Sequence, residues 1–138
     1  MSNTPRVTAL SDGAPYAVTL EDSFGHRWVA DEPREAGGGG TGPGPHALLL
    51  SSLGACTAIT LRMYAARKAW PLTGLEVEVA FNPDGTPADG ASEIRRRITL
   101  RGALTLGQRE RLLEVANKCP LHRVLSGTVR LATSLAPP

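Results

Sequence analysis

A stretch without Asp, Glu, Lys or Arg, Gly37 to Leu61, constrains the fold of this chain most strongly. Glycines and prolines lead into an apolar run that carries Cys56 near its middle. An uncharged helix that is apolar around most of its circumference has to be buried. Small polar residues interrupt the run, which is too short for the roughly 20 continuous apolar residues that cross a bilayer. We therefore expect the central helix of a soluble core, from near Pro45 to about Lys68, with its first two thirds buried.

The composition excludes several classes of function. A length of 138 residues fits a single domain, 1–138. The 15 basic residues are interspersed with 13 acidic ones, for a net charge of +2, and aromatic residues make up 4%. Neither a basic patch nor an aromatic stacking surface for nucleic acid is indicated. The N-terminus lacks the apolar core of a signal peptide, so we expect a cytoplasmic protein without a membrane partner, whose cysteines are free, metal-bound or redox-active.

The region before the helix predicts a hairpin. Residues alternate between polar and apolar from Tyr16 to Glu21 and again from His26 to Ala30, with turn residues between them. A short strand at Val7 to Leu10 precedes this hairpin. The glycine-rich segment 34–44 is expected to be a flexible loop that crosses to the helix.

A second hairpin is predicted after the helix, from residues 75–81 and 94–104. Pairing Phe81 with Ile94 places apolar residues opposite apolar ones and Glu opposite Arg along both strands. Arg96 is the exception, because this register puts it on the apolar face. Either its stem lies along a strand edge or bulge while its charge reaches water, or its cation reaches into a site.

The sequence that follows predicts a second helix. Thr105 and Gln108 have the spacing of a capping box, and the helix is expected to end at Asn117 or Lys118. Its expected apolar face consists of Leu106, Leu112, Leu113 and Ala116.

The second cysteine follows directly. Pro120 biases Cys119 away from helical geometry, so its sulfur should lie at a fixed elbow. A short helical turn at Leu121 to Leu125 is expected, then a break at Gly127 and a last strand over residues 129–133, where apolar residues alternate.

These elements predict an α+β fold in which an antiparallel sheet packs on a long central helix and a second helix. One small sheet covers such a helix poorly. A second copy of the chain can supply the opposite wall, so we expect a homodimer.

Three kinds of chemistry are open to the two cysteines. Cys56 and Cys119 can be passive core residues, because a thiol packs as a small hydrophobe. They can form a thiol–disulfide couple, in which one thiolate attacks a peroxide oxygen and the second thiol resolves the sulfenic acid. Together with His46 and His122 they can be metal ligands, but one Cys-x-x-His fragment is weak support, and we expect no metal. The glycines at 37–42 lack the Lys and Ser or Thr of a phosphate loop.

Four segments in order resemble the OsmC/Ohr superfamily of osmotically inducible and organic hydroperoxide resistance proteins. They are ADEP at 30–33, GGTGPGPHALLLSSLGACTA at 39–58, LRMYAARKAWPL at 61–72 and ANKCPLHRVL at 116–125. The last segment contains the CPxHR signature of the small OsmC-like branch.

The resemblance implies an OsmC-like fold in an intertwined homodimer with active sites at the subunit interface. It implies that Cys56 is the peroxidatic cysteine and Cys119 the resolving one. The similar enzymes reduce organic hydroperoxides to alcohols and are recharged by external dithiols, often lipoyl groups, with no bound cofactor.

The carboxylate that the family uses is missing here. Hydroperoxide resistance proteins have a glutamate ten residues before the peroxidatic cysteine, where this chain has His46. The next position, acidic in many relatives of the small branch, is Ala47. Glu32 or Glu35 could supply the carboxylate from the loop.

The family's thiolate-stabilising arginine, expected in the first hairpin, also lacks a clear counterpart. Arg27 is the replacement candidate, followed by Arg96 and Arg123. The sequence thus supports a thiol-dependent peroxidase that uses Cys56, Cys119 and an arginine. The alternative is a non-catalytic OsmC-like dimer that binds a hydrophobic small molecule, with the cysteines as passive lining.

Overall fold

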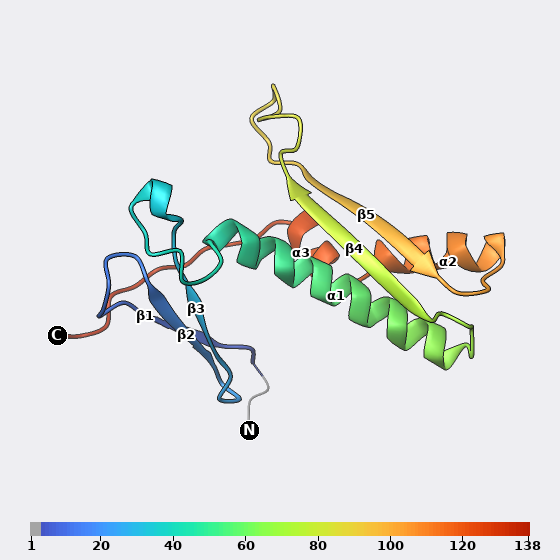
Figure 1. Ribbon diagram of the computed structural model, residues 1–138, viewed down its shortest axis with the longest axis horizontal. Helices are drawn as coiled ribbons and strands as arrows, with labels where there is room; N and C mark the ends of the chain where they lie inside the picture. Colours follow the sequence, from blue (N-terminus) through green and yellow to red (C-terminus); the bar gives the residue numbers. More distant parts are fainter. Residues whose placement is uncertain (1–3) are drawn as a thin grey trace. The chain divides into compact units, whose positions relative to one another are not determined.

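The computed structural model of the protein describes residues 4–138 and is an α+β structure of two compact units, divided after Leu49. The first unit contains a three-stranded sheet, and the second contains a hairpin and the helices (Figure 1). In chain order the elements are β1 (Val7–Leu10), β2 (Val18–Asp22), β3 (Arg27–Ala30), the 3-10 helix η1 (Arg34–Ala36), α1 (Pro45–Arg67), β4 (Gly74–Phe81), β5 (Ile94–Arg101), α2 (Leu106–Ala116) and α3 (Pro120–Ser126).

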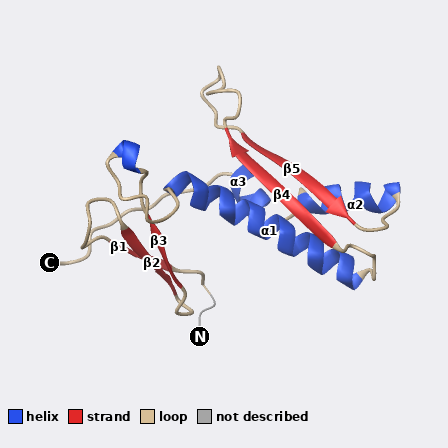
Figure 2. Cartoon of the chain, in the orientation of Figure 1, coloured by secondary structure: helices blue, strands red, loops and turns tan. Residues whose placement is uncertain are grey.

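The first unit confirms the predicted hairpin and the strand before it. Strands β1, β2 and β3 pair antiparallel in that order (Figure 2). Asp22 closes the β2–β3 turn, where its Oδ1 accepts hydrogen bonds from the backbone N–H groups of Phe24 (2.8 Å) and His26 (2.9 Å). An Asx-type turn of this kind is the local chemistry that the sequence indicated.

The glycine-rich segment differs from the expected flexible loop, because it is ordered around the carboxylate of Asp31. This side chain is only 3% exposed. Its Oδ2 accepts hydrogen bonds from Thr41 Oγ1 (2.6 Å), Thr41 N (3.1 Å) and Gly39 N (3.2 Å), and its Oδ1 accepts one from Glu32 N (2.7 Å). These bonds, with that from the Thr41 hydroxyl the largest contribution, hold the pKa of the Asp31 carboxyl below its usual value.

Two glycines of this segment are required by close packing. A Cβ at Gly38 would overlap the backbone carbonyl of Glu32, and a Cβ at Gly42 would overlap that of Val29. The glycines therefore let the segment lie directly against the backbone around the end of β3.

Helix α1 has the predicted bounds to within one residue at its end, but its burial differs from the prediction. The buried side chains, Leu53, Thr57, Leu61 and Ala65, form one stripe with a spacing of four along the helix, not its first two thirds. On other faces, Ile59 and Met63 are each 58% exposed. By length and composition α1 could also span a membrane, a property that core helices share. The single chain thus leaves much of this apolar helix uncovered.

The β4–β5 hairpin has the predicted register, with Phe81 opposite Ile94 and Glu78 opposite Arg97. It lies across α1 with α2 alongside (Figure 1), and the core forms where Leu61 of α1 packs against α2 and the hairpin. The predicted second strand is too long. It ends at Arg101 because Gly102 has a φ of +133°, which takes the chain out of the ladder.

Helix α2 begins with the predicted capping box. Gln108 N donates to Thr105 Oγ1 (3.1 Å), and Thr105 N donates to Gln108 Oε1 (2.9 Å). The predicted face is wrong in part, because Leu106 and Leu113 are exposed. The buried residues are Leu112, Val115 and Ala116.

The end of the chain contains α3, as predicted, but not the predicted last strand. Within residues 4–138, the segment after Ser126 pairs with no strand, and Leu131 is 90% exposed. Alternation favours an extended conformation, but a strand forms only where a partner edge offers hydrogen bonds.

Candidate active site

Arg96 links the middle of α1, the end of α2 and the N-cap of α3. It lies opposite Val79 in the hairpin register, on the strand face that packs toward the helices. Its Nη1 donates a hydrogen bond to Thr57 Oγ1 of α1 (2.8 Å) and contacts Cys119 Sγ, the N-cap of α3, at 3.8 Å. Its Nη2 donates to Asn117 Oδ1, at the end of α2 (3.0 Å). The cation of Arg96 therefore reaches into a cluster of polar groups, which is one of the two interpretations that the sequence left open.

His122 completes the set of groups around this guanidinium. Arg96 Nη2 lies 2.9 Å from His122 Nδ1. An arginine can only donate, so Nδ1 accepts and the imidazole carries its proton on Nε2. With Thr57 and Asn117, His122 fixes the plane of the guanidinium against the sulfur of Cys119.

Cys119 lies at the elbow that Pro120 predicted. Its backbone is extended (φ −64°, ψ 149°), and its Sγ accepts a hydrogen bond from His122 N (3.4 Å). The residue is 0% exposed. A thiol in this position is shielded from solvent but is surrounded by hydrogen-bond donors.

Thr57 lies between the arginine and this sulfur. It is fully buried, and its hydroxyl donates to Leu53 O (2.7 Å) while accepting from Arg96. Its Oγ1 is 3.9 Å from Cys119 Sγ, where either atom can donate. When Cys119 is ionised, the Thr57 hydroxyl can turn toward the sulfur and donate to the thiolate.

Cys56 precedes Thr57 on α1, and the structure brings it to Cys119. Cys56 is among the neighbours that lower the pKa of the Cys119 thiol, and both cysteines are free. Cys56 is only half-buried, whereas Cys119 is completely buried. The two cysteines of one chain are therefore neighbours, and Cys119 is the more deeply buried of the two.

The surroundings of Cys119 favour its thiolate. Burial alone raises the pKa of the Cys119 thiol, but the hydrogen bonds outweigh burial and hold the pKa below its usual value. In decreasing order, they come from His122 N, Thr57, Cys56 and Arg96. Hydrogen bonds that favour the charged form of a group shift its pKa in this direction.

A family model described as OsmC-like protein matches residues 37–134, which include both cysteines and Arg96. The chain belongs to the OsmC-like protein family. No curated protein sequence matches it.

Solved structures of OsmC-like proteins share this fold. An OsmC-like protein from Mycoplasma pneumoniae is similar with a TM-score of 0.74 and 23% identity, over 92% of this chain and 90% of the other. An organic hydroperoxide resistance protein OsmC from Legionella pneumophila gives 0.65 and 23%, over 90% of both chains. The organic hydroperoxide resistance protein OhrB of Bacillus subtilis gives 0.61 and 21%, over 90% and 91%.

The remaining site candidates of this OsmC-like chain lie as follows. Arg27 is exposed on β3 and pairs with Glu21 of β2 at 3.2 Å, so its expected role at a thiolate stays a prediction. Arg123 is exposed on α3. In the first unit, Glu35 is exposed in η1 and His46 is exposed in the first turn of α1.

Sequence reasoning missed Thr57 and Asn117. Their signal was present, because each lies within two positions of a cysteine and has a side chain able to donate or accept a hydrogen bond.

The sequence also suggested a set of metal ligands. The described residues 4–138 contain no group of three or more His, Cys, Asp or Glu side chains that could hold a metal ion.

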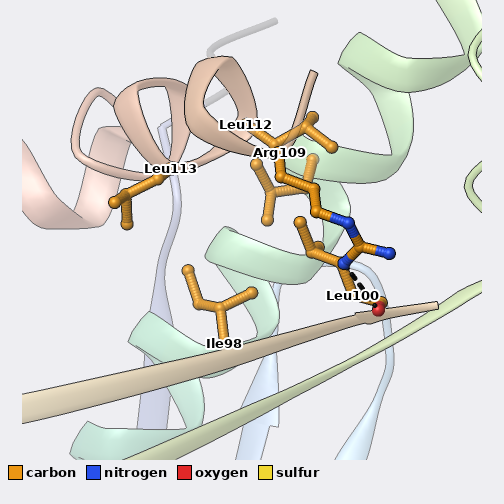
Figure 3. Close-up of a pocket in the computed structure, with 6 residues that line it drawn as sticks. Ile98, Leu100, Arg109, Leu112 and Leu113 are labelled. Atoms are coloured by element: carbon orange, nitrogen blue, oxygen red, sulfur yellow. Dashed lines mark hydrogen bonds between the residues drawn. The ribbon is translucent and has the colours of Figure 1, made fainter. Parts of the chain in front are cut away.

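Two cavities flank the hairpin face that carries Arg96. One, of about 300 Å³, is lined on its polar side by Arg96, Asn117 and His122, and its apolar lining is Leu53, Ile94, Ile98 and Leu113. The other, of about 270 Å³, has an apolar lining of Leu61, Ile98, Leu100, Leu112 and Leu113. Figure 3 shows Arg109 at its rim, where the side chain donates to Leu100 O (3.2 Å). Neither cavity is lined by a cysteine, so a ligand in either would not touch the thiols directly.

Proposed function

We propose that this OsmC-like protein reduces organic hydroperoxides to alcohols through a cycle between Cys56 and Cys119. The observation that carries the proposal is that the two free thiols are neighbours and that Cys119 lies beside the guanidinium of Arg96. Two thiols in contact can form a disulfide, and a neighbouring cation supplies the thiolate character that the chemistry requires. The fold shared with organic hydroperoxide resistance proteins agrees with this function.

The half-buried Cys56 reacts first, because it is the thiol that a peroxide can reach. Its thiolate attacks the distal oxygen of the hydroperoxide, and the oxygen–oxygen bond breaks. The alkoxide leaves and takes a proton from water to become the alcohol. Cys56 is left as the sulfenic acid, which holds both oxidising equivalents of the peroxide.

The buried Cys119 then resolves this intermediate. Its thiolate attacks Cys56 Sγ, the disulfide bond forms, and hydroxide leaves and is protonated to water. An external dithiol, for which we propose a lipoyl group, reduces the disulfide and becomes a disulfide itself. This cycle requires no bound cofactor.

Because of its contacts, we assign Arg96 as the arginine that stabilises a thiolate in this cycle. It lies 3.8 Å from Cys119 Sγ, and no ion pair in residues 4–138 joins it to a carboxylate. Its charge is therefore available to a thiolate, even though the family's glutamate is replaced. Arg27 is the further candidate, and Arg27→Met in the turnover assay tests whether it contributes.

We also propose that the protein acts as a cytoplasmic homodimer. The exposed apolar side chains of α1, including Ile59 and Met63, form a surface that a second copy can cover. The unpaired segment after α3 is a second element that a partner chain can take up.

Turnover of cumene hydroperoxide with dihydrolipoamide tests the peroxidase function. We expect Cys56→Ser to abolish turnover, and Cys119→Ser to consume about one equivalent of peroxide before stopping, because the sulfenic acid is then not resolved. Full dithiol-dependent activity in Cys56→Ser would contradict the proposal.

A second candidate function, binding of a hydrophobic small molecule, is favoured by the apolar cavity in Figure 3. A ligand there would contact Leu61 and Leu112, and the cysteines would be passive. Binding of a fluorescent hydrophobic probe separates the two functions. Equal affinity in both serine variants, together with absent peroxide turnover in the unmodified protein, would favour the binding function.

A further inference from the structure

We infer that the Cys56–Cys119 disulfide is reduced in one direction only, with the external thiol attacking Cys56 and Cys119 leaving as a thiolate held by Arg96. This inference rests on the proposed couple between the two cysteines. It assigns the site at which a reductant of the thiol class reacts, and it assigns to Arg96 a role in the reductive half of the cycle.

Solvent access selects the sulfur that is attacked. Cys119 is 0% exposed, whereas Cys56 is half-buried on α1. A thiolate has to approach a disulfide sulfur directly, along the line of the bond that breaks. In the single chain, Cys119 is closed to an external thiol, whereas Cys56 lies on the partly exposed side of the pair, which makes it the cysteine that an external thiol attacks.

The cation and the hydrogen-bond donors around Cys119 favour the same direction of attack, because they stabilise Cys119 as the leaving thiolate. As the attacking sulfur bonds to Cys56, the electron pair of the broken disulfide bond moves to Cys119 Sγ. That atom faces the guanidinium of Arg96 at 3.8 Å, the backbone N–H of His122 at 3.4 Å and the Thr57 hydroxyl at 3.9 Å. These groups are in place before the reaction, so they stabilise negative charge where it develops.

The position of Arg96 is itself fixed by other side chains. Asn117 Oδ1 and His122 Nδ1 accept from Nη2, and Thr57 Oγ1 accepts from Nη1. Of the groups that hydrogen-bond to Cys119 or to Arg96 within residues 4–138, Arg96, His122 and Cys56 carry ionisable side chains, and none is a carboxylate. No carboxylate repels the leaving Cys119 thiolate. Cys56 does not repel it either, because Cys56 is uncharged while it is bonded to the reductant.

The remaining step restores both thiols. In the mixed disulfide, Cys56 Sγ is bonded to one sulfur of the dithiol. The second thiolate of the dithiol attacks that sulfur, so the dithiol closes into its own disulfide and Cys56 leaves as a thiolate. Two electrons have then passed from the dithiol to the protein, and the two protons that the dithiol loses balance the protonation of the Cys56 and Cys119 thiolates to thiols.

A monothiol that cannot close a ring tests the direction, because it stops at the mixed disulfide. The disulfide is formed with diamide, which avoids any dependence on peroxide, and the oxidised protein is exposed briefly to β-mercaptoethanol. Acid quenching, alkylation of the freed thiol and peptide mapping by mass spectrometry then locate the adduct. We expect the adduct on Cys56 and the alkyl group on Cys119. An adduct on Cys119, equal labelling of both positions, or no disulfide with diamide would overturn the inference.

Substitution of the arginine tests its role. We expect Arg96→Met to slow the release of Cys119 about tenfold, the loss expected for one charge-assisted hydrogen bond. Arg96→Lys should restore part of the rate, because it keeps the charge but not the geometry of the fork. Arg97→Met is the matched control, since Arg97 is exposed on the opposite face of the same strand, and its rate should be unchanged. Equal rates in Arg96→Met and the unmodified protein would overturn the role of Arg96.

This result is independent of the proposed peroxidase function. If diamide forms the disulfide and the adduct maps to Cys56, but organic hydroperoxides fail to oxidise the protein, the inference stands and the proposed function fails. If hydroperoxides form the disulfide but the adduct maps to Cys119, the proposed function stands and the inference fails.

Discussion

Arg96 Nη1 lies 3.8 Å from Cys119 Sγ, although the two residues belong to a strand and to the cap of a helix separated by the whole of α2. The same nitrogen donates to Thr57 Oγ1, directly after Cys56 on α1. The arginine on the apolar face of the hairpin is thereby linked to both cysteine segments. The contact explains why a cation is found at a strand position that otherwise favours an apolar residue.

This contact predicts a low thiol pKa for Cys119 that depends on the arginine. In a Cys56→Ser background, the ultraviolet absorbance of the thiolate reports Cys119 alone. Because hydrogen bonds and positive charge favour the ionised form, the thiolate should persist to a pH below the ordinary cysteine pKa of about 8.5. Arg96→Met should raise the midpoint, and Arg97→Met should leave it unchanged. A midpoint that Arg96→Met does not move would show that the guanidinium has no part in the titration.

The glycine-rich segment should tolerate a methyl group poorly where it touches the backbone. A Cβ at Gly38 would overlap the carbonyl of Glu32, so Gly38→Ala should destabilise the protein by about 1–3 kcal/mol. At Gly13 nothing lies within 4 Å of the added atom, so Gly13→Ala should have little effect. Thermal unfolding measures both variants. Equal unfolding temperatures would mean that the segment is not packed as described.

Asp31 should make the stability of the protein sensitive to acid. Its carboxyl has a lowered pKa in the folded protein, so its stabilisation is complete above the unfolded-state pKa of about 3.9 and is lost as the pH falls through the folded-state pKa. Asp31→Asn should therefore lower the unfolding temperature by several degrees at neutral pH. In acid below both pKa values, the difference should vanish.

Asp12→Asn is the control for this experiment, because Asp12 is exposed in the loop after β1. It should change the unfolding temperature little at either pH. A difference between Asp31→Asn and the unmodified protein that stays constant from neutral pH into acid would contradict the role of the ionised carboxylate.

The exposed apolar face of α1 should hold two copies of the chain together. Ile59 is 58% exposed, and Ile59→Glu would place a charge in the proposed interface. Sedimentation should show a dimer for the unmodified protein and a shift toward monomer for the variant. Thr99→Glu, on the outer face of β5, is the control and should stay dimeric. A monomeric unmodified protein at micromolar concentration would contradict the proposed homodimer.

Local patterns in the sequence predicted several elements correctly. The register that pairs Phe81 with Ile94 followed from alternation on both strands, and the capping box of Thr105 and Gln108 followed from spacing alone. The elbow at Cys119 followed from the proline after it. Each of these features depends on residues that are near in sequence or on a simple pairing rule.

Features that depend on distant partners could not be predicted in this way. Arg96 stood out as a cation on an apolar face, but its contacts with Asn117 and His122 depend on how α2 and α3 pack. The order of the glycine-rich segment depends on the carboxylate of Asp31, eight to ten residues away. The predicted last strand failed because alternation at 129–133 says nothing about a partner edge.

The most direct test of the account is the mass of the reduced protein after one equivalent of an organic hydroperoxide, repeated with hydrogen peroxide. We predict the loss of two hydrogens, a bond that maps to Cys56 and Cys119, and faster oxidation by the organic peroxide. If both thiols stay reduced with either peroxide, the contact between the two cysteines is a feature of the fold only, and the proposed peroxidase function is wrong.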